Sequence, residues 1–166
     1  RAVAALKAGS QPELDRPLSQ GTDLNLYVPA LLPSNYLPDV HTRLILYKRI
    51  ANAPDVQTLE DLQVELIDRF GLLPDPAKAL LQIAALKLQA TPLGIRKIDF
   101  GAKGGYLLFE DHTTVEPQQI VQLVQSQPGW YKFDGQRKLQ LQLELPEFAA
   151  RCQVLEKVLA ELNEVQ

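Results

Sequence analysis

The chain contains no methionine, one cysteine and two histidines in 166 residues. The single cysteine, Cys152, excludes an intramolecular disulfide and is typical of a reducing compartment, so we expect a cytoplasmic protein. No apolar run reaches the roughly 20 residues that a membrane-spanning helix needs, and the first residues lack the pattern of a secretory signal. We therefore expect no membrane partner.

The chain also has little net charge, -3 at neutral pH. A charge this small provides no overall field to hold a nucleic-acid backbone or an anionic lipid surface. Hydrophobic residues make up 46% of the chain and charged residues 22%, which is typical of a folded globular domain. The length is sufficient to bury a hydrophobic core.

The beginning of the chain differs in composition from the rest. Residue 1 is Arg rather than Met, from which we expect the chain to be a piece of a longer protein. Residues 1–8 have the composition of a helix end, and residues 10–21 are polar and include two prolines, which is typical of an exposed linker. We therefore predict two parts: residues 1–21, the tail of a preceding domain with a linker, and residues 22–166, a C-terminal domain.

Three helices are predicted in the first half of this domain. The first runs from an N-cap at Asp39 to about Ala51. The second starts at Pro54 and Asp55 and ends at Gly71. The expected apolar stripe of the first is Val40, Leu44, Tyr47 and Ala51, widened by Leu46 and Ile50. That of the second is Val56, Leu59, Leu62, Leu66, Ile67 and Phe70.

The third predicted helix, residues 75–90, starts with Asp75 as N-cap and Pro76 in its first turn. It is apolar on almost every side, so we expect it to be central and buried.

After residue 91 the period of the apolar residues changes from that of a helix to that of a strand. A short strand is expected earlier, at residues 24–28. Two hairpins are predicted here, and Asp134-Gly135 is a strong turn signal in the second. A short helix separates the hairpins and a final helix follows them. The strands are 95–100, 106–109, 130–133 and 138–145, and the helices are 116–125 and one whose stripe is Phe148, Cys152, Leu155, Leu159 and Leu162. The predicted fold class is α+β: a helical half, then antiparallel β-hairpins with a short helix between them, then a C-terminal helix.

The second predicted helix has a compact acidic face. Asp61, Glu65 and Asp68 fall within an arc of about 60° opposite the apolar side. Arg69 follows Glu65 by four residues, in the favourable order for an ion pair within a helix. Two interpretations remain open: a solvated surface, or a docking surface for a partner that carries arginines.

Catalytic and metal sites have little support in the sequence. Paired catalytic carboxylates need environments that separate their pKa values, and a polar helix face offers none. His41 and His112 have no ligand at metal-binding spacing. Cys152 lies on an apolar stripe, which is typical of a structural thiol. We therefore expect neither an enzyme nor a bound cofactor or metal.

A nucleic-acid module is the alternative function. The segment 103–109 slightly resembles the aromatic strand of an RNA-recognition motif, and Trp130, Tyr131, Lys132 and Lys138 follow on the predicted sheet. Aromatic residues on a sheet can stack on bases. The other interpretation, which we prefer, is a hairpin with ordinary core and edge aromatics. We therefore expect no direct nucleic-acid partner.

Two segments carry a family resemblance. LLPSNYLPDVHTRLILYKRI, residues 31–50, and VELIDRFGLLPDPA, residues 64–77, resemble the C-terminal domain of the bacterial transcription-repair coupling factors, the Mfd family. The resemblance is specific over residues 24–94 and weaker through LGIRKIDFGAKGG and WYKFDG. It implies that the first residues are the tail of a motor domain.

The family resemblance also implies a regulatory role. In that family the parent protein recognises stalled RNA polymerase, translocates on DNA with ATP and recruits repair through UvrA. Its C-terminal domain has no ATPase motif, and it clamps the parent's UvrB-like N-terminal module so that the UvrA-binding surface is hidden. The family's clamp residues match Glu65, Asp68 and Arg69 here. Asp61 is our addition from the helical geometry.

Overall fold

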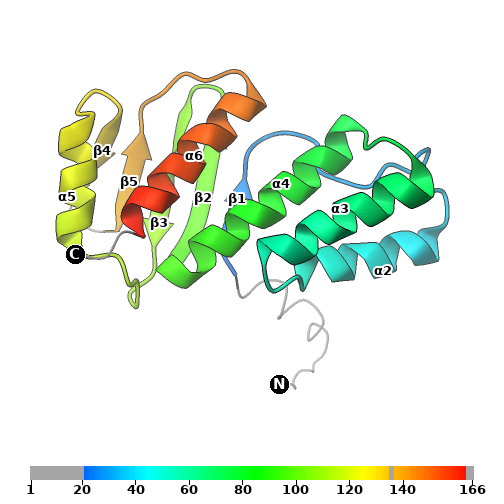
Figure 1. Cartoon of the computed structure of the whole chain (residues 1–166). Coiled ribbons are helices and arrows are strands. Elements are labelled where there is room, and N and C mark those ends of the chain that lie inside the picture. The colour runs from blue at the N-terminus through cyan, green and yellow to red at the C-terminus, as the bar shows by residue number, and fades with distance from the viewer. Residues whose placement is uncertain (1–20, 135–136, 164–166) are drawn as a thin grey trace, which may run out of the picture.

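The computed structural model describes residues 21–134 and 137–163. The predicted tail and linker, apart from Gly21, lie outside the described residues, as does Gly135 of the predicted turn. The division at residue 21 stays a prediction. The described chain has a helical half beside a half built on a β-sheet (Figure 1).

The three predicted helices are confirmed: α2 (Val40–Ala51), α3 (Val56–Phe70) and α4 (Asp75–Ala90). Asp39 accepts a hydrogen bond from the Thr42 N–H at 2.9 Å, and Asp55 accepts one from the Thr58 N–H at 2.8 Å. These contacts cap α2 and α3 by satisfying amides that have no partner within the helix. Pro74, and not the predicted Asp75, is the N-cap of α4.

The predicted apolar stripe of α2 is wrong in part. Val40 and Leu44 are 58% and 56% exposed, whereas Leu46 and Ile50 are buried in the cluster between the helices. Tyr47 is half-buried, and its hydroxyl oxygen accepts a hydrogen bond from the Leu32 N–H at 2.7 Å. Apolar residues occur on both sides of this helix, so periodicity alone does not identify the side that contacts α3 and α4.

The sheet has five strands in the order β1-β2-β3-β5-β4. The strands are β1 (Asp23–Asn25), β2 (Ile95–Gly101), β3 (Gly104–Phe109), β4 (Tyr131–Phe133) and β5 (Lys138–Leu141). Both predicted hairpins are confirmed, although β5 is shorter than the predicted segment 138–145. The sheet is mixed rather than antiparallel throughout, because β1 pairs with β2 in parallel. A parallel partner far away in the sequence leaves no turn signal.

Helices cover one face of this sheet. A short 3₁₀ turn, η1 (Thr91–Leu93), leads from α4 into β2, and α5 (Pro117–Ser126) and α6 (Phe148–Leu162) complete the layer (Figure 1). Four members of the predicted α6 stripe are buried, and Phe148 is half-buried. The α+β class is therefore confirmed.

Two hydrophobic clusters form the core, and α4 belongs to both. Ala77 and Leu81, near its start, pack with α2 and α3. Leu86 and Ala90, near its end, pack with the sheet, α5 and α6. The prediction of a central, buried helix is confirmed, because α4 joins the two halves.

A buried arginine joins two distant segments. Arg151 in α6 is 3% exposed, and it donates to the carbonyl oxygens of Leu145 at 2.7 Å and Leu26 at 3.0 Å. A buried guanidinium is costly unless its N–H groups find acceptors. The contacts hold the chain after β1 against the chain before α6, and the sequence had not indicated them.

Candidate protein-interaction surface

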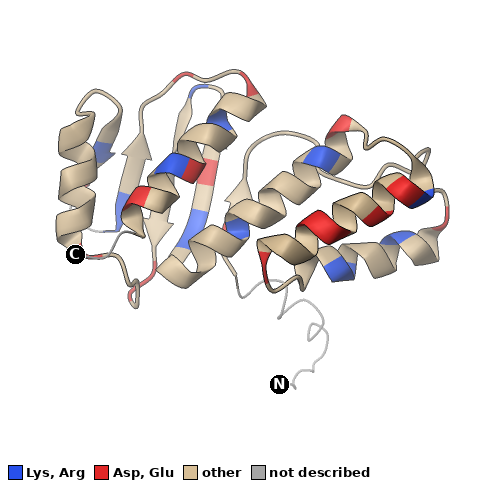
Figure 2. Cartoon of the chain, in the orientation of Figure 1, with Lys and Arg blue, Asp and Glu red and all other residues tan. Residues whose placement is uncertain are grey.

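The predicted acidic residues lie together on the outward side of α3. Leu59, Leu62 and Leu66 are buried on the opposite side. Asp61 and Asp68 are exposed, and the side chain of Glu65 is 33% exposed. Figure 2 shows acidic residues following one another along this helix. The geometry agrees with the sequence analysis, and a role in binding stays a prediction.

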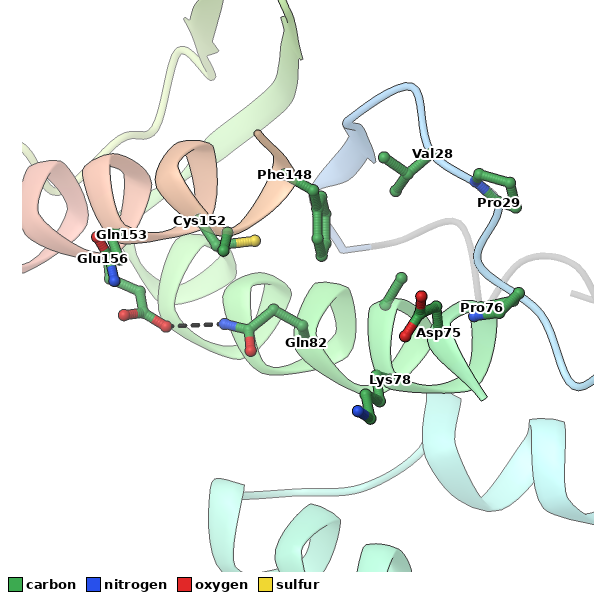
Figure 3. A pocket seen from close by; sticks show the side chains of 12 residues that line it. Val28, Pro29, Asp75, Pro76, Lys78, Gln82, Phe148, Cys152, Gln153 and Glu156 are labelled. Atoms are coloured by element: carbon green, nitrogen blue, oxygen red, sulfur yellow. Dashed lines mark hydrogen bonds between the residues drawn. The ribbon is translucent and has the colours of Figure 1, made fainter. Parts of the chain in front are cut away.

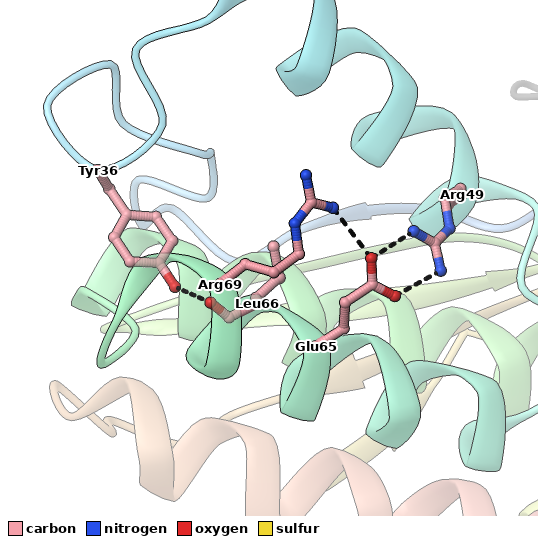
Figure 4. A network of polar contacts seen from close by, with 5 residues as sticks. All are labelled: Tyr36, Arg49, Glu65, Leu66 and Arg69. Atoms are coloured by element: carbon pink, nitrogen blue, oxygen red, sulfur yellow. Dashed lines mark hydrogen bonds and ion pairs between the residues drawn. The ribbon is translucent and has the colours of Figure 1, made fainter.

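Glu65 is held by two arginines (Figure 4). Arg49 of α2 makes two parallel hydrogen bonds to its carboxylate, each 2.9 Å long, and Arg69 adds one of 3.1 Å. The hydrogen bonds from Arg49, helped by the one from Arg69, lower the pKa of Glu65 from 4.5 to about 2, although burial opposes the shift. Paired guanidinium–carboxylate contacts fix orientation as well as charge.

Arg49 is a residue that the sequence analysis missed. It is 16 positions before Glu65 and on another helix, so no pattern within α3 could have indicated the contact. The two residues meet only because the tertiary fold brings α2 and α3 into the same hydrophobic cluster. The pair Glu65–Arg69, in contrast, was expected from the four-residue spacing and is present at 3.1 Å.

The remaining charges on this face are less constrained. Asp61 accepts a hydrogen bond from Gln57 at 3.0 Å, and Asp68 has no cation within ion-pair distance among the described residues. The guanidinium of Arg69 lies 4.8 Å from the ring centre of Phe70. The face therefore presents two negative charges beside an oriented arginine.

An apolar side chain lies within the charged face. Val64 is 67% exposed, and its position on α3 is between those of Asp61 and Asp68. Interfaces commonly surround an apolar centre with polar residues. Val64 was not among the residues predicted from the sequence. The sequence signal that could have indicated it is the spacing, because Val64 follows Asp61 by three residues and precedes Asp68 by four. We call the set Asp61, Val64, Glu65, Asp68 and Arg69 the α3 surface.

Replacing Arg49 with Met is expected to raise the pKa of Glu65 from about 2 toward 4.5. Because the folded pKa is the lower one, the stabilisation is fully present above pH 4.5 and is lost as the pH falls through about 2. The pair is partly exposed, so the loss of stability at pH 7 should be less than ~1 kcal/mol. NMR titration of the Glu65 carboxyl measures the shift. Lys48→Met, on the same helix, is the control, and an unchanged titration in Arg49→Met would contradict the assignment.

A pocket of about 600 Å³ lies away from the α3 surface, between α4, α6 and the chain after β1 (Figure 3). Its walls are largely apolar, with Phe148 and Val28 among them. Cys152 lines it, and burial raises the pKa of the thiol to about 11, so the group is protonated at neutral pH. A protonated thiol is a poor nucleophile. No group of three or more potential metal ligands occurs among the described residues.

Comparison with known proteins identifies the family. The sequence profile of the TRCF domain matches residues 26–120. The chain belongs to the TRCF domain family. The match includes all three helices of the helical half, α2, α3 and α4, and strands β2 and β3 of the sheet half. The resemblance inferred from residues 31–50 and 64–77 is thereby confirmed.

The relatives are longer than this TRCF domain. The transcription-repair-coupling factor of Escherichia coli (strain K12) is 47% identical over 98% of the chain, which spans 14% of that protein. That of Haemophilus influenzae is 47% identical over 92% of the chain and 13% of its own length. The chain thus corresponds to a small part of each.

A solved structure supports the fold. The crystal structure of the C-terminal domain of a transcription-repair coupling factor superposes with a TM-score of 0.71, covering 86% of this chain and 89% of that one. Its identity of 24% makes this a likeness of fold. None of the described helices is long and apolar enough to cross a membrane.

Proposed function

We propose that this TRCF domain is a non-catalytic, autoinhibitory module of a transcription-repair coupling factor. Its α3 surface clamps the UvrB-like N-terminal module of the same parent protein and masks the surface that UvrA binds. The clamp opens when the parent, an ATP-dependent DNA translocase, engages stalled RNA polymerase. The observation that carries the proposal is the exposed α3 surface, with two uncompensated aspartates beside an oriented Arg69.

The charges of the α3 surface indicate the chemistry of the partner. Asp61 and Asp68 suit arginines, whose planar guanidinium groups bind carboxylates with two hydrogen bonds. Arg69, fixed by Glu65, suits an acceptor such as a carboxylate or a backbone carbonyl. Val64 adds a site for an apolar or aromatic side chain. Complementary charges give orientation and selectivity more than affinity.

A weak contact is sufficient for a clamp within one protein. Exposed ion pairs contribute only about 0.2–1 kcal/mol each. Tethering compensates, because a flexible connection gives an effective concentration in the ~mM range. Such a contact stays closed in the resting protein, yet a competing interaction elsewhere can open it.

Charge reversal tests the proposed clamp. We expect the chain to bind the separately expressed UvrB-like module, and Glu65→Lys with Asp68→Lys to weaken binding about tenfold or more, because like charges then face each other. Isothermal titration calorimetry at high protein concentration measures both. Asp61→Lys with Asp68→Lys is a second variant that leaves the contacts of Glu65 with Arg49 and Arg69 intact.

The control variant is Glu144→Lys with Glu156→Lys, which makes the same change in net charge on exposed residues of the sheet half. It should bind like the unmodified chain. Circular dichroism checks that every variant is folded. If the α3 variants and the control bind equally well, the α3 surface is only a solvated face and the contact lies elsewhere.

A further inference from the structure

The face of the sheet opposite the helices carries a group of cations. Along β2, β3 and β5 the residues under the helices are buried, among them Ile98, Leu107 and Leu139. The residues that alternate with them are half-buried and polar or aromatic in most cases: Lys97, Asp99, Tyr106, Leu108, Lys138 and Gln140. Alternation of this kind places the second set on the other face.

The strand register arranges these residues in rows. Lys97, Leu108 and Lys138 are cross-strand partners in one row. Tyr106 and Gln140 belong to the next row, which continues to Lys132 on β4. Strands lie about 4.8 Å apart, so Lys97 and Lys138 are separated by roughly 10 Å across the face. The lysines thus lie on three strands, β2, β5 and β4, and not on one exposed loop.

A β-bulge adds an arginine to this face. Ile95 pairs with Phe109 and Lys97 pairs with Leu108, so Arg96 is an extra residue on β2. Bulges change the direction of a side chain. Arg96 here lines a shallow pocket of about 330 Å³ together with Tyr106, Arg137 and Lys138.

The pocket has an excess of positive charge. Three cations line it, Arg96, Arg137 and Lys138, against one carboxylate, Asp134. Arg137 pairs with the exposed Asp111, while Arg96 and Lys138 have no carboxylate within ion-pair distance among the described residues. The Lys138 ammonium instead lies 4.5 Å from the ring centre of Tyr106.

A second aromatic residue extends the face toward β1. Tyr27 is 60% exposed, and its hydroxyl donates to Asp99, with 2.8 Å to one carboxylate oxygen and 2.9 Å to the other. Its backbone is left-handed, with φ of 58°, a conformation that costs a non-glycine residue energy and is common at binding sites. Asp99 is the cross-strand partner of Tyr106. The side chains of Tyr27, which contacts Asp99, and of Tyr106 therefore belong to the same part of the sheet face.

We propose that this face binds single-stranded nucleic acid, with a backbone phosphate in the pocket of Arg96 and Lys138 and a base against Tyr106. Guanidinium and ammonium groups are the usual phosphate ligands. Beside them, the half-buried ring of Tyr106 and the exposed ring of Tyr27 favour unpaired bases, whose faces are free to stack. The net charge of -3 gave no reason to expect this partner, because it averages over the whole chain.

Fluorescence anisotropy of a labelled 12-nucleotide single-stranded DNA with the full 166-residue chain tests the proposal. We expect binding at 50 mM salt that weakens roughly tenfold at 200 mM, since two or three phosphate contacts give a logarithmic salt dependence of about -1.4 to -2.1. Arg96→Glu with Lys138→Glu should weaken binding at 50 mM salt at least tenfold. Tyr106→Leu should weaken it about fivefold, through lost stacking.

Lys48→Glu with Lys157→Glu is the matched control, because both lysines are exposed and lie on other surfaces. It should bind within about twofold of the unmodified chain, and circular dichroism confirms folding. Absence of binding at 50 mM salt, or equal weakening by the control, would overturn the proposal. Equally tight binding of double-stranded DNA would also overturn it, because a duplex has no unpaired bases. Equally tight binding of polyglutamate would do the same, because this polyanion contains no bases.

Discussion

Replacing Gly105 with Ala is expected to destabilise the domain by at least about 3 kcal/mol, because the added methyl group meets backbone that cannot move aside. Gly105 in β3 pairs with Phe100 in β2. A Cβ at Gly105 would overlap the Asp99 carbonyl oxygen and lie 2.6 Å from the Phe100 Cα. The hairpin would have to open to accommodate it.

Thermal unfolding followed by circular dichroism measures this effect, and we expect the Tm to fall by about 10 °C. Gly129→Ala is the control, because no atom beyond the adjacent residues lies within 4 Å of a Cβ at that position. It should change the Tm by no more than about 2 °C. A Gly105→Ala variant as stable as the control would mean that β2 and β3 are not as close as described.

The second large effect is expected at the junction of the two halves. Leu86 in α4 is fully buried beneath the sheet, and Leu86→Ala should cost about 2–5 kcal/mol through lost burial and the cavity left behind. Because α4 belongs to both clusters, we expect the helical half and the sheet half to unfold together in the variant as in the unmodified chain.

Urea denaturation followed by circular dichroism and by fluorescence of Trp130, in the sheet half, measures both expectations. Leu72→Ala is the matched control, since that leucine is 86% exposed and its truncation should cost no more than about 0.5 kcal/mol. A loss below ~1 kcal/mol in Leu86→Ala would contradict the central position of α4. Two separate transitions would show that the halves are independent.

Local signals predicted much of the fold. The predicted N-cap Asp39, the predicted start at Pro54 and Asp55, and Gly71 after α3 placed these helix ends close to where the structure has them. Capping depends on hydrogen bonds between residues three apart, so a short segment contains all the information. The hairpins were predictable for the same reason, and the acidic face of α3 follows from helical spacing alone.

The sequence by itself determined the α+β class, the approximate ends of α2 and α3, and the row Asp61, Glu65 and Asp68. Only the tertiary structure decided which side of α2 is buried, that Arg49 meets Glu65, that β1 lies parallel to β2, and that Arg151 is buried. The physical reason is how far apart in the sequence the contacting residues are. Caps, turns and helix faces arise from contacts a few residues apart, whereas these four features need segments 16 to 125 residues apart to meet.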